Sequence, residues 1–115
     1  MRGATTGVLD MQLEDYFEFI SGEEIRLCGS RVGIEAVLSE YLGGALPEEI
    51  ALNYPPVTLE QVHASITYYL SHRKAMDEYL DRWTDRGEQA LRQQRTGGSS
   101  VIDRLTQARH SRTPP

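Results

Sequence analysis

The sequence predicts a small, mostly α domain of the winged/helix-turn-helix-like type, with three helices, an N-terminal β-hairpin and an extended third helix. Two patterns carry this prediction. From Ile34 onward, apolar residues recur at the three- and four-residue spacing of amphipathic helices. Before them, aromatic and branched residues flank a Ser21-Gly22 turn signal. With 115 residues, 39% of them hydrophobic, the chain can support one compact domain with appendages but not two independent cores.

The N-terminal part predicts an arm followed by a hairpin. Residues 1–12 are small and polar without a period, so we expect a flexible arm. Residues 16–20 and 24–27 have strand-forming composition on either side of the turn. Because two strands alone are marginally stable, the hairpin must pack on helices or pair with a partner chain. Its exposed edge is a candidate dimer contact.

Two short helices are expected next. The first should end at Gly43-Gly44. The second begins at Pro47, with Glu48 and Glu49 favoured by the helix dipole, and ends at residues 54–56. We expect the first helix to bury the stripe Ile34, Val37, Leu38, Tyr41 and Leu42, and the second to bury Ile50 and Leu52.

A long third helix should begin at Thr58, where Gln61 completes a capping box. It is expected to run to Trp83 or on to Arg95, because no strong helix breaker precedes Gly87. Its far end extends beyond a three-helix domain, so its apolar residues need a partner. We expect dimerisation there, or a return of Met76, Leu80 and Trp83 onto the hairpin. The predicted dimer residues are Tyr69, Met76, Leu80 and Trp83.

The predicted organisation is therefore an arm at 1–12, a domain at 13–80, a helical extension at 81–95 and a flexible tail at 96–115. Residues 96–100 read Thr-Gly-Gly-Ser-Ser, the composition of a linker. The short amphipathic segment after it is too short to be a stable helix alone. It is disordered by itself, or it folds on binding a toxin or a nucleic acid.

Charge is unevenly distributed along the chain. The net charge is −5: residues 1–79 carry five Lys or Arg against thirteen acids, and residues 80–115 carry seven Arg against four acids. An acidic domain binds duplex DNA poorly, because affinity rests largely on neutralising phosphates. Clustered cations, a dimer or the basic tail would have to overcome this. Otherwise the acidic domain suits a basic protein.

Catalysis and metal binding are not predicted. His63 and His72 are nine residues apart on one expected helix and point to opposite faces. Cys28 is the single cysteine, so no internal disulfide is possible, and we expect its thiol to be buried or half-buried. No cofactor or metal is expected. Without a long apolar segment the chain should have no contact with membrane and should be cytoplasmic.

Two motifs carry a family resemblance. Residues 26–34 read Arg-Leu-Cys-Gly-Ser-Arg-Val-Gly-Ile, and residues 46–58 run from Leu-Pro-Glu-Glu-Ile to Tyr-Pro-Pro-Val-Thr. From about Tyr16 to His72 the chain resembles the bacterial family called domain of unknown function 433, although Gly33 stands where many relatives have proline. The resemblance implies a helix-turn-helix DNA-binding regulator, commonly the antitoxin and autorepressor of a toxin–antitoxin pair.

On that interpretation the third helix reads operator DNA. Gln61 and Ser65 would face outwards with Tyr68, which instead could pack at an interface. Gln61 could contact adenine or lie on an ordinary solvated face. Arg31 could bind phosphate or form an ion pair that fixes its turn, and Arg73 with Lys74 is the only basic cluster of the domain. The predicted DNA-binding residues are Arg31, Thr58, Gln61, Ser65, Arg73 and Lys74.

The resemblance also implies a toxin partner, often a PIN-like ribonuclease with an acidic metal-holding site. Arg104, Arg109 or Arg112 has the charge to enter such a site. The alternative is a non-enzymatic protein-interaction adaptor that uses the same fold without DNA binding. In both cases we expect a homodimer. The predicted toxin-binding residues are Val101, Ile102, Arg104, Leu105 and Arg109.

Overall fold

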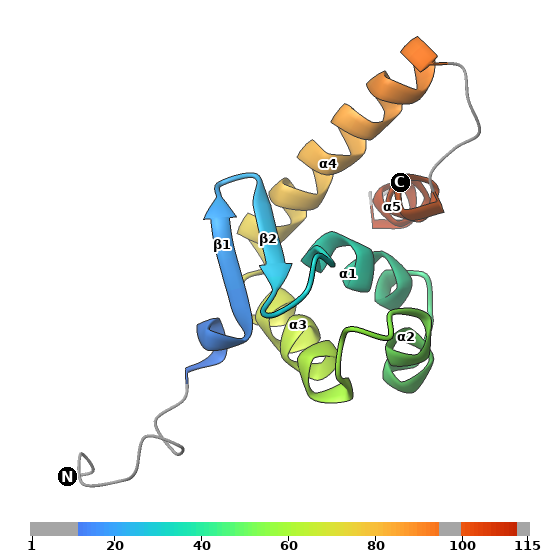
Figure 1. Ribbon diagram of the computed structural model, residues 1–115. Coiled ribbons are helices and arrows are strands. Elements are labelled where there is room, and N and C mark those ends of the chain that lie inside the picture. Colours follow the sequence, from blue (N-terminus) through green and yellow to red (C-terminus); the bar gives the residue numbers. More distant parts are fainter. Residues whose placement is uncertain (1–11, 95–99, 113–115) are drawn as a thin grey trace, which may run out of the picture.

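The computed structural model describes residues 12–94 and 100–112, so the predicted arm and linker lie almost wholly outside the described residues. A two-stranded hairpin lies beside a group of helices, and one long helix projects past them (Figure 1). The mostly α class is confirmed. The elements in order are η2 (Leu13–Tyr16), β1 (Phe17–Ser21), β2 (Glu24–Leu27), α1 (Ile34–Leu42), α2 (Pro47–Asn53), α3 (Leu59–Ser71), α4 (Arg73–Gln94) and α5 (Ser100–Arg112).

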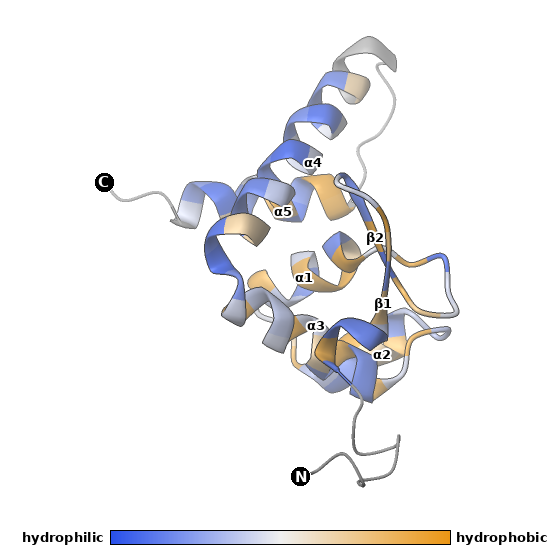
Figure 2. Ribbon diagram, turned by 90° about the vertical axis from the view of Figure 1, so that its left-hand side faces the viewer, coloured by the Kyte–Doolittle hydropathy of each residue, from blue (hydrophilic) through white to orange (hydrophobic). Residues whose placement is uncertain are grey.

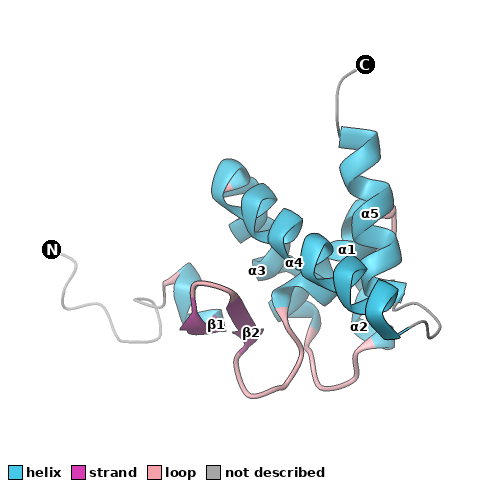
Figure 3. Ribbon diagram, turned by 90° about the horizontal axis from the view of Figure 1, so that it is seen from above, coloured by secondary structure: helices cyan, strands magenta, loops and turns pink. Residues whose placement is uncertain are grey.

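The hairpin forms where the sequence predicted it. β1 and β2 are antiparallel, with Phe17 opposite Leu27 and Phe19 opposite Ile25, and an irregularity follows Phe19. Phe17, Ile25 and Leu27 are buried in the core. Seen from above, the hairpin lies to one side of the helices (Figure 3).

The first two helices also match their predicted bounds. α1 ends at Leu42 with Gly43 as its C-cap, and Gly44 follows with a φ of 101°, a left-handed conformation that glycine adopts without strain. Ile34, Val37 and Leu38 are fully buried. In Figure 2 the apolar parts of α1 lie toward the interior of the helix group. The expectation that Leu52 of α2 is buried is wrong: its side chain is 80% exposed. Ile50 alone anchors α2 with a fully buried side chain.

The predicted single third helix is divided in two at His72. Its φ and ψ are −132° and 45°, outside the helical region, and α3 ends before it while α4 starts after it. The His72 ring stacks on Tyr68, with centroids 4.2 Å apart, and its Nδ1 lies 3.0 Å from the Tyr68 carbonyl oxygen. This local hydrogen bonding competes with helix continuation. The periodicity continues across the break, which is why the sequence did not reveal it.

α4 packs on the hairpin and α1 through a buried polar link. The Tyr79 hydroxyl accepts a hydrogen bond from the Ile25 amide (3.1 Å) and donates one to Glu35 Oε1 (2.9 Å). Burial raises the pKa of Glu35, and burial with the neighbouring Glu35 raises the pKa of Tyr79. The Glu35 carboxylate occupies the space that a Cβ at Gly33 would need. Any side chain at position 33 would have to displace this carboxylate.

No helix among the described residues is long and apolar enough to cross a bilayer.

Glu35→Gln tests whether ionisation of the buried Glu35 side chain lowers the stability of the fold. The folded chain keeps the Glu35 proton to a higher pH than the unfolded chain, so stability is lost as pH rises through the raised pKa. Glutamine can still accept from Tyr79 but cannot ionise. Thermal melts should show variant and wild type melting alike below the ordinary carboxyl range. The variant should gain several degrees at neutral pH, since about 1 kcal/mol shifts Tm by roughly 4–8 °C in a domain of about this size.

The matched control is Glu78→Gln, which removes a carboxylate from an exposed position on α4. Its melting temperature should follow that of the wild type across the same pH range. If Glu35→Gln also follows the wild type, the buried carboxylate carries no ionisation penalty.

Candidate functional site

The α1–α3 unit, defined here as residues 32–72, is joined to the hairpin through the first turn of α3. Thr58 caps α3 by accepting from the Gln61 amide (3.0 Å), and Gln61 Oε1 accepts from the Thr58 amide (3.0 Å), which confirms the predicted capping box. Gln61 Nε2 donates to the Cys28 carbonyl oxygen (2.9 Å). Both ends of the Gln61 amide are therefore engaged within the chain, whereas base reading would need them free.

The outward face of α3 differs from the predicted one. Ser65 was expected on the outward stripe, but it is fully buried and its hydroxyl donates to the Gln61 carbonyl oxygen (2.9 Å). The heptad seam misplaced it because α1, α2 and η2 all pack on α3, so more than the seam face is covered. Tyr68 is half-buried against the aromatic rings of β1. The exposed face consists of Leu59, Glu60, His63, Thr67 and Leu70.

The charge of this unit has a single sign. Residues 32–72 contain five Glu and no Lys, Arg or Asp. Glu35 and Glu40 are buried, whereas Glu48, Glu49 and Glu60 are exposed on α2 and α3. A helix entering a DNA groove approaches phosphates on both sides, and these carboxylates would be repelled by them.

The same unit exposes large apolar side chains. Leu46, Leu52 and Leu59 are 61%, 80% and 40% exposed, and all three lie in α2 or beside its junctions with neighbouring elements. α2 and α3 pack against each other, so these leucines and the three exposed glutamates belong to one structural unit. We call these six residues the acidic-leucine surface.

The six predicted DNA-binding residues are not brought together. Thr58 and Gln61 lie at the start of α3, and Arg73 and Lys74 lie beyond its end, about 20 Å away along a 13-residue helix. Arg73 lies over the Tyr69 ring, 5.0 Å from its centroid, and 3.9 Å from Asp77. Arg31 is exposed, and among the described residues it forms no ion pair, so the predicted turn-fixing pair is not observed.

The predicted dimer seam is used within the chain. Tyr69, Met76 and Leu80 are 1%, 3% and 2% exposed in the single chain, so the expectation that they need a partner chain is wrong. Trp83 returns to the hairpin, the alternative considered from sequence: its Nε1 donates to the Glu23 carbonyl oxygen (3.0 Å). Arg86 then covers the Trp83 ring at 4.8 Å and pairs with Glu23 at 3.0 Å.

Within the expected flexible tail, the described residues 100–112 form α5, which packs on α1 and α4, so the expectation of flexibility is wrong for them. Ile102 and Leu105, predicted as toxin contacts, are buried in the core, and Val101 is partly buried beside it. Ile102 fills the space beside Gly87 where any Cβ would collide with it. Glycine inside a helix costs about 1 kcal/mol relative to alanine. The close approach of α5 accounts for glycine at this position of α4.

Two arginines hold α5 at separate places. Arg104 Nε donates to Ser39 Oγ (3.1 Å), and its guanidinium lies 3.7 Å from Glu40 and 3.5 Å from the Tyr54 hydroxyl. Burial raises the pKa of Tyr54. We call this the Arg104 contact; it joins α5 to α1 and to the end of α2.

The second contact joins α5 to α4. Arg109 lies among three carboxylates of α4, at 2.9 Å from Asp85, 3.9 Å from Asp81 and 4.0 Å from Glu88. Thr106 donates to Glu88 at 2.7 Å. Positions 81, 85 and 88 are spaced i, i+4 and i+7, which places the three acids on one face of α4. We call this the Arg109 contact. Each of these ion pairs is partly exposed to solvent and therefore weak by itself. The contact holds α5 because one guanidinium interacts with three carboxylates.

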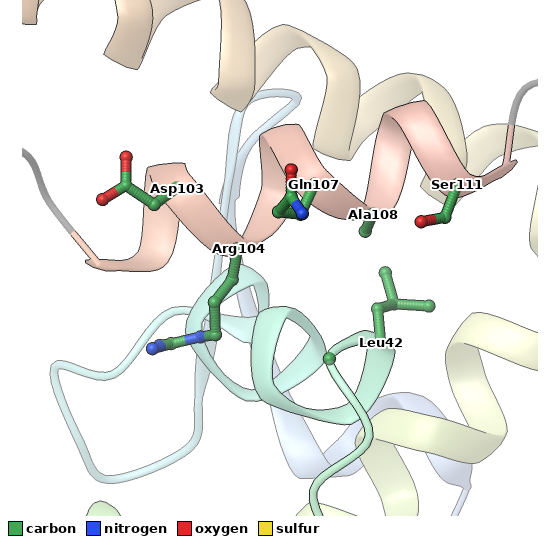
Figure 4. Close-up of a pocket in the computed structure, with 7 residues that line it drawn as sticks. Leu42, Asp103, Arg104, Gln107, Ala108 and Ser111 are labelled. Carbon is green, nitrogen blue, oxygen red and sulfur yellow. The ribbon is translucent and has the colours of Figure 1, made fainter.

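A pocket of about 430 Å³ lies beside α5, and Figure 4 shows Arg104 and Leu42 at its wall between α1 and α5. Its lining includes few groups with acid–base chemistry, and the Arg104 guanidinium points toward α1, where it is already bound. Cys28, expected to be buried or half-buried, is exposed instead. Within the described ranges, no group of His, Cys, Asp and Glu is arranged to hold a metal ion.

Residues 19–69 match the model of the family described as Protein of unknown function (DUF433), so the resemblance seen in the sequence is confirmed for this segment. The match extends from β1 to near the end of α3, and α4 and α5 lie beyond it. Neither the curated proteins nor the solved structures contain a match to the chain. The antitoxin type implied by the resemblance therefore stays a prediction.

Gly87→Ala tests the packing of α5 against α4. In an open helix this change would stabilise α4 by about 1 kcal/mol, but here the new methyl group would displace Ile102. We expect a net loss of stability of about 1–3 kcal/mol, typical of overpacking, with faster amide exchange in α5. Gln89→Ala, at an exposed position of the same helix, is the control and should change little. A Gly87→Ala variant more stable than wild type would contradict this packing.

Proposed function

We propose that this chain is a non-enzymatic protein-interaction module that binds a basic partner protein on the acidic-leucine surface of α2 and α3. The observation that carries the proposal is the absence of any Lys or Arg from residues 32–72, against five Glu. The α1–α3 unit was expected to read DNA, but its charge is that of a surface that attracts cations.

DNA reading by α3 is disfavoured by three separate features. Gln61 is engaged in the capping box and with Cys28, and Ser65 is buried. The exposed basic pair Arg73 and Lys74 lies at the opposite end of α3 from Gln61. Phosphate neutralisation supplies much of the affinity of DNA-binding proteins, and this unit has no cation for it.

Protein binding is favoured by the combination of exposed leucines and carboxylates. Leu52, at 80% exposure, can be buried by a partner, and such apolar anchors carry much of the energy of interfaces. Glu48 and Leu52 are four residues apart, so they share one face of α2. Carboxylates around an apolar centre steer a basic partner and determine its orientation.

An antitoxin is one form of such a module, and the Arg109 contact favours it as a second candidate. Arg109 already lies among three carboxylates of its own chain. An acidic, metal-holding nuclease site offers the same ligand chemistry, so α5 could exchange its internal acids for those of a toxin. In this version the module acts in the bacterial cytoplasm, and its partner is the toxin.

The first test uses the product of the neighbouring open reading frame as the partner, with affinity measured by calorimetry. Glu48→Gln combined with Leu52→Ser should weaken binding by at least about tenfold, since one buried leucine is worth about 1.5–3 kcal/mol. Glu78→Gln on α4 is the control. Equal binding by the double variant would exclude this surface.

A duplex from the chain's own promoter region provides the second arm. Fluorescence anisotropy at low and moderate salt should show no binding at either. Tight binding that falls steeply with salt would overturn the proposal in favour of a DNA-binding regulator.

The antitoxin version is tested by growth rescue. If the neighbouring product is toxic, full-length chain should relieve toxicity, and truncation after Arg95 should abolish relief. Arg109→Gln should weaken relief while leaving Ile102 and Leu105 in place, because its side chain is outside the apolar core. Full rescue by both variants would exclude α5 as the inhibitory segment.

A further inference from the structure

β1 exposes two large apolar side chains beside an edge that no described strand pairs. Phe19 and Ile20 are 47% and 49% exposed, and of the five residues of β1 only Phe17 is buried. Figure 1 shows β1 on the outside, with β2 between it and α1. Among the described residues, β2 is the only strand that pairs with β1. An exposed apolar edge of this kind is a template for another strand.

The hydrogen bonds of β2 establish which backbone groups of β1 face outwards. The Ile25 amide donates to Tyr79 (3.1 Å) and the Leu27 amide donates to the Val32 carbonyl oxygen (2.9 Å), so both point away from β1. Their opposite residues on β1 are Phe19 and Phe17, which by the antiparallel alternation direct their own amide and carbonyl groups to the open edge.

Phe19 is the centre of this open edge. The Phe17 amide is already used, because it donates to the Glu14 carbonyl oxygen at the end of η2. Phe19 therefore presents both a donor and an acceptor in the middle of a five-residue strand. Residues placed in this way pair reciprocally across a twofold axis, each donating to the other's carbonyl.

The side chains next to this edge form a continuous aromatic cluster. The Phe19 ring lies 6.0 Å from Phe17 and 5.9 Å from Tyr68, and His72 stacks on Tyr68. Aromatic clusters of this kind gain further energy from edge-to-face contacts with another ring. The cluster supports Phe19 from below, so a second Phe19 would meet an ordered ring.

We propose that β1 pairs antiparallel with β1 of a second copy of this chain, centred on Phe19, so that the two hairpins form one four-stranded sheet. A second copy fits this register because self-pairing centred on Phe19 brings no like charges together. Centring on Phe19 places Glu18 opposite Ile20 of the other copy, and no like charges face each other. Centring one residue earlier would place the two Glu18 side chains opposite each other.

A four-stranded sheet would also be more stable than the two-stranded hairpin, which is only marginally stable by itself. The helical seam that the sequence predicted for dimerisation is filled by the chain itself, because Tyr69, Met76 and Leu80 are buried in the single chain. The β1 edge is separate from the acidic-leucine surface of α2 and α3, so this inference stands whether or not the proposed function is correct.

Sedimentation of the full chain over a range of concentrations tests the pairing. Wild type should show a monomer–dimer equilibrium. Phe19→Lys would place two ammonium groups face to face and should weaken dimerisation by about tenfold or more. Leu70→Lys adds the same charge at a site of matched exposure, 50% against 47%, and should leave the dimer intact. A wild-type monomer at every concentration, or a dimer indifferent to Phe19→Lys, would overturn the proposal.

Amide hydrogen exchange on the wild type keeps the test decisive if Phe19→Lys fails to fold. The Phe19 amide should be protected in concentrated solution and exchange freely on dilution, while the amides bonded between β1 and β2 stay protected in both. Protection of Phe19 that persists in the monomer would show that the chain covers its own edge, and free exchange at high concentration would show that nothing covers it; either result contradicts the pairing.

Discussion

The hydroxyl of Tyr79 is the constraint on which the arrangement of the hairpin, α1 and α4 depends. It accepts from the Ile25 amide of β2 and donates to Glu35 of α1, and its own ring is buried in the core. A two-stranded hairpin has little stability of its own. By bonding an amide that points away from β1, Tyr79 attaches the hairpin to the helices and leaves the opposite edge of β1 to the solvent.

The cost of this link lies in the buried carboxylate of Glu35, whose pKa is raised by burial. Gly33 lacks the Cβ that would collide with that carboxylate, and Gly87 similarly makes room for Ile102. The two glycines therefore mark two close approaches in the fold. Gly33 leaves room for the Glu35 carboxylate that links α1 to Tyr79, and Gly87 allows α5 to pack closely on α4.

The packing of α4 and α5 changes which surfaces are available to partners. The chain buries the seam of α4 with its own hairpin and with α5, and Arg104 and Arg109 bind acids of α1 and α4. The acidic-leucine surface and the edge of β1 stay exposed. We propose the first as the site for a basic protein and the second as the site for another copy of the chain; the two surfaces are separate, so a dimer formed through β1 would leave the first open.

The sequence by itself determined the local structure. Turn signals, glycines and capping residues act between neighbours in the chain. They predicted the hairpin, the ends of α1 and α2, and the Thr58–Gln61 cap. Short motifs in the sequence likewise indicated the family that residues 19–69 match. Only the tertiary structure decided that Ser65 is buried, that Leu52 is exposed, and that Ile102 and Leu105 belong to the core. A helical period shows which residues share a face, but it does not show how many faces of the helix are covered. That depends on contacts between distant parts of the chain, such as Ile102 with Gly87 and Tyr79 with Glu35.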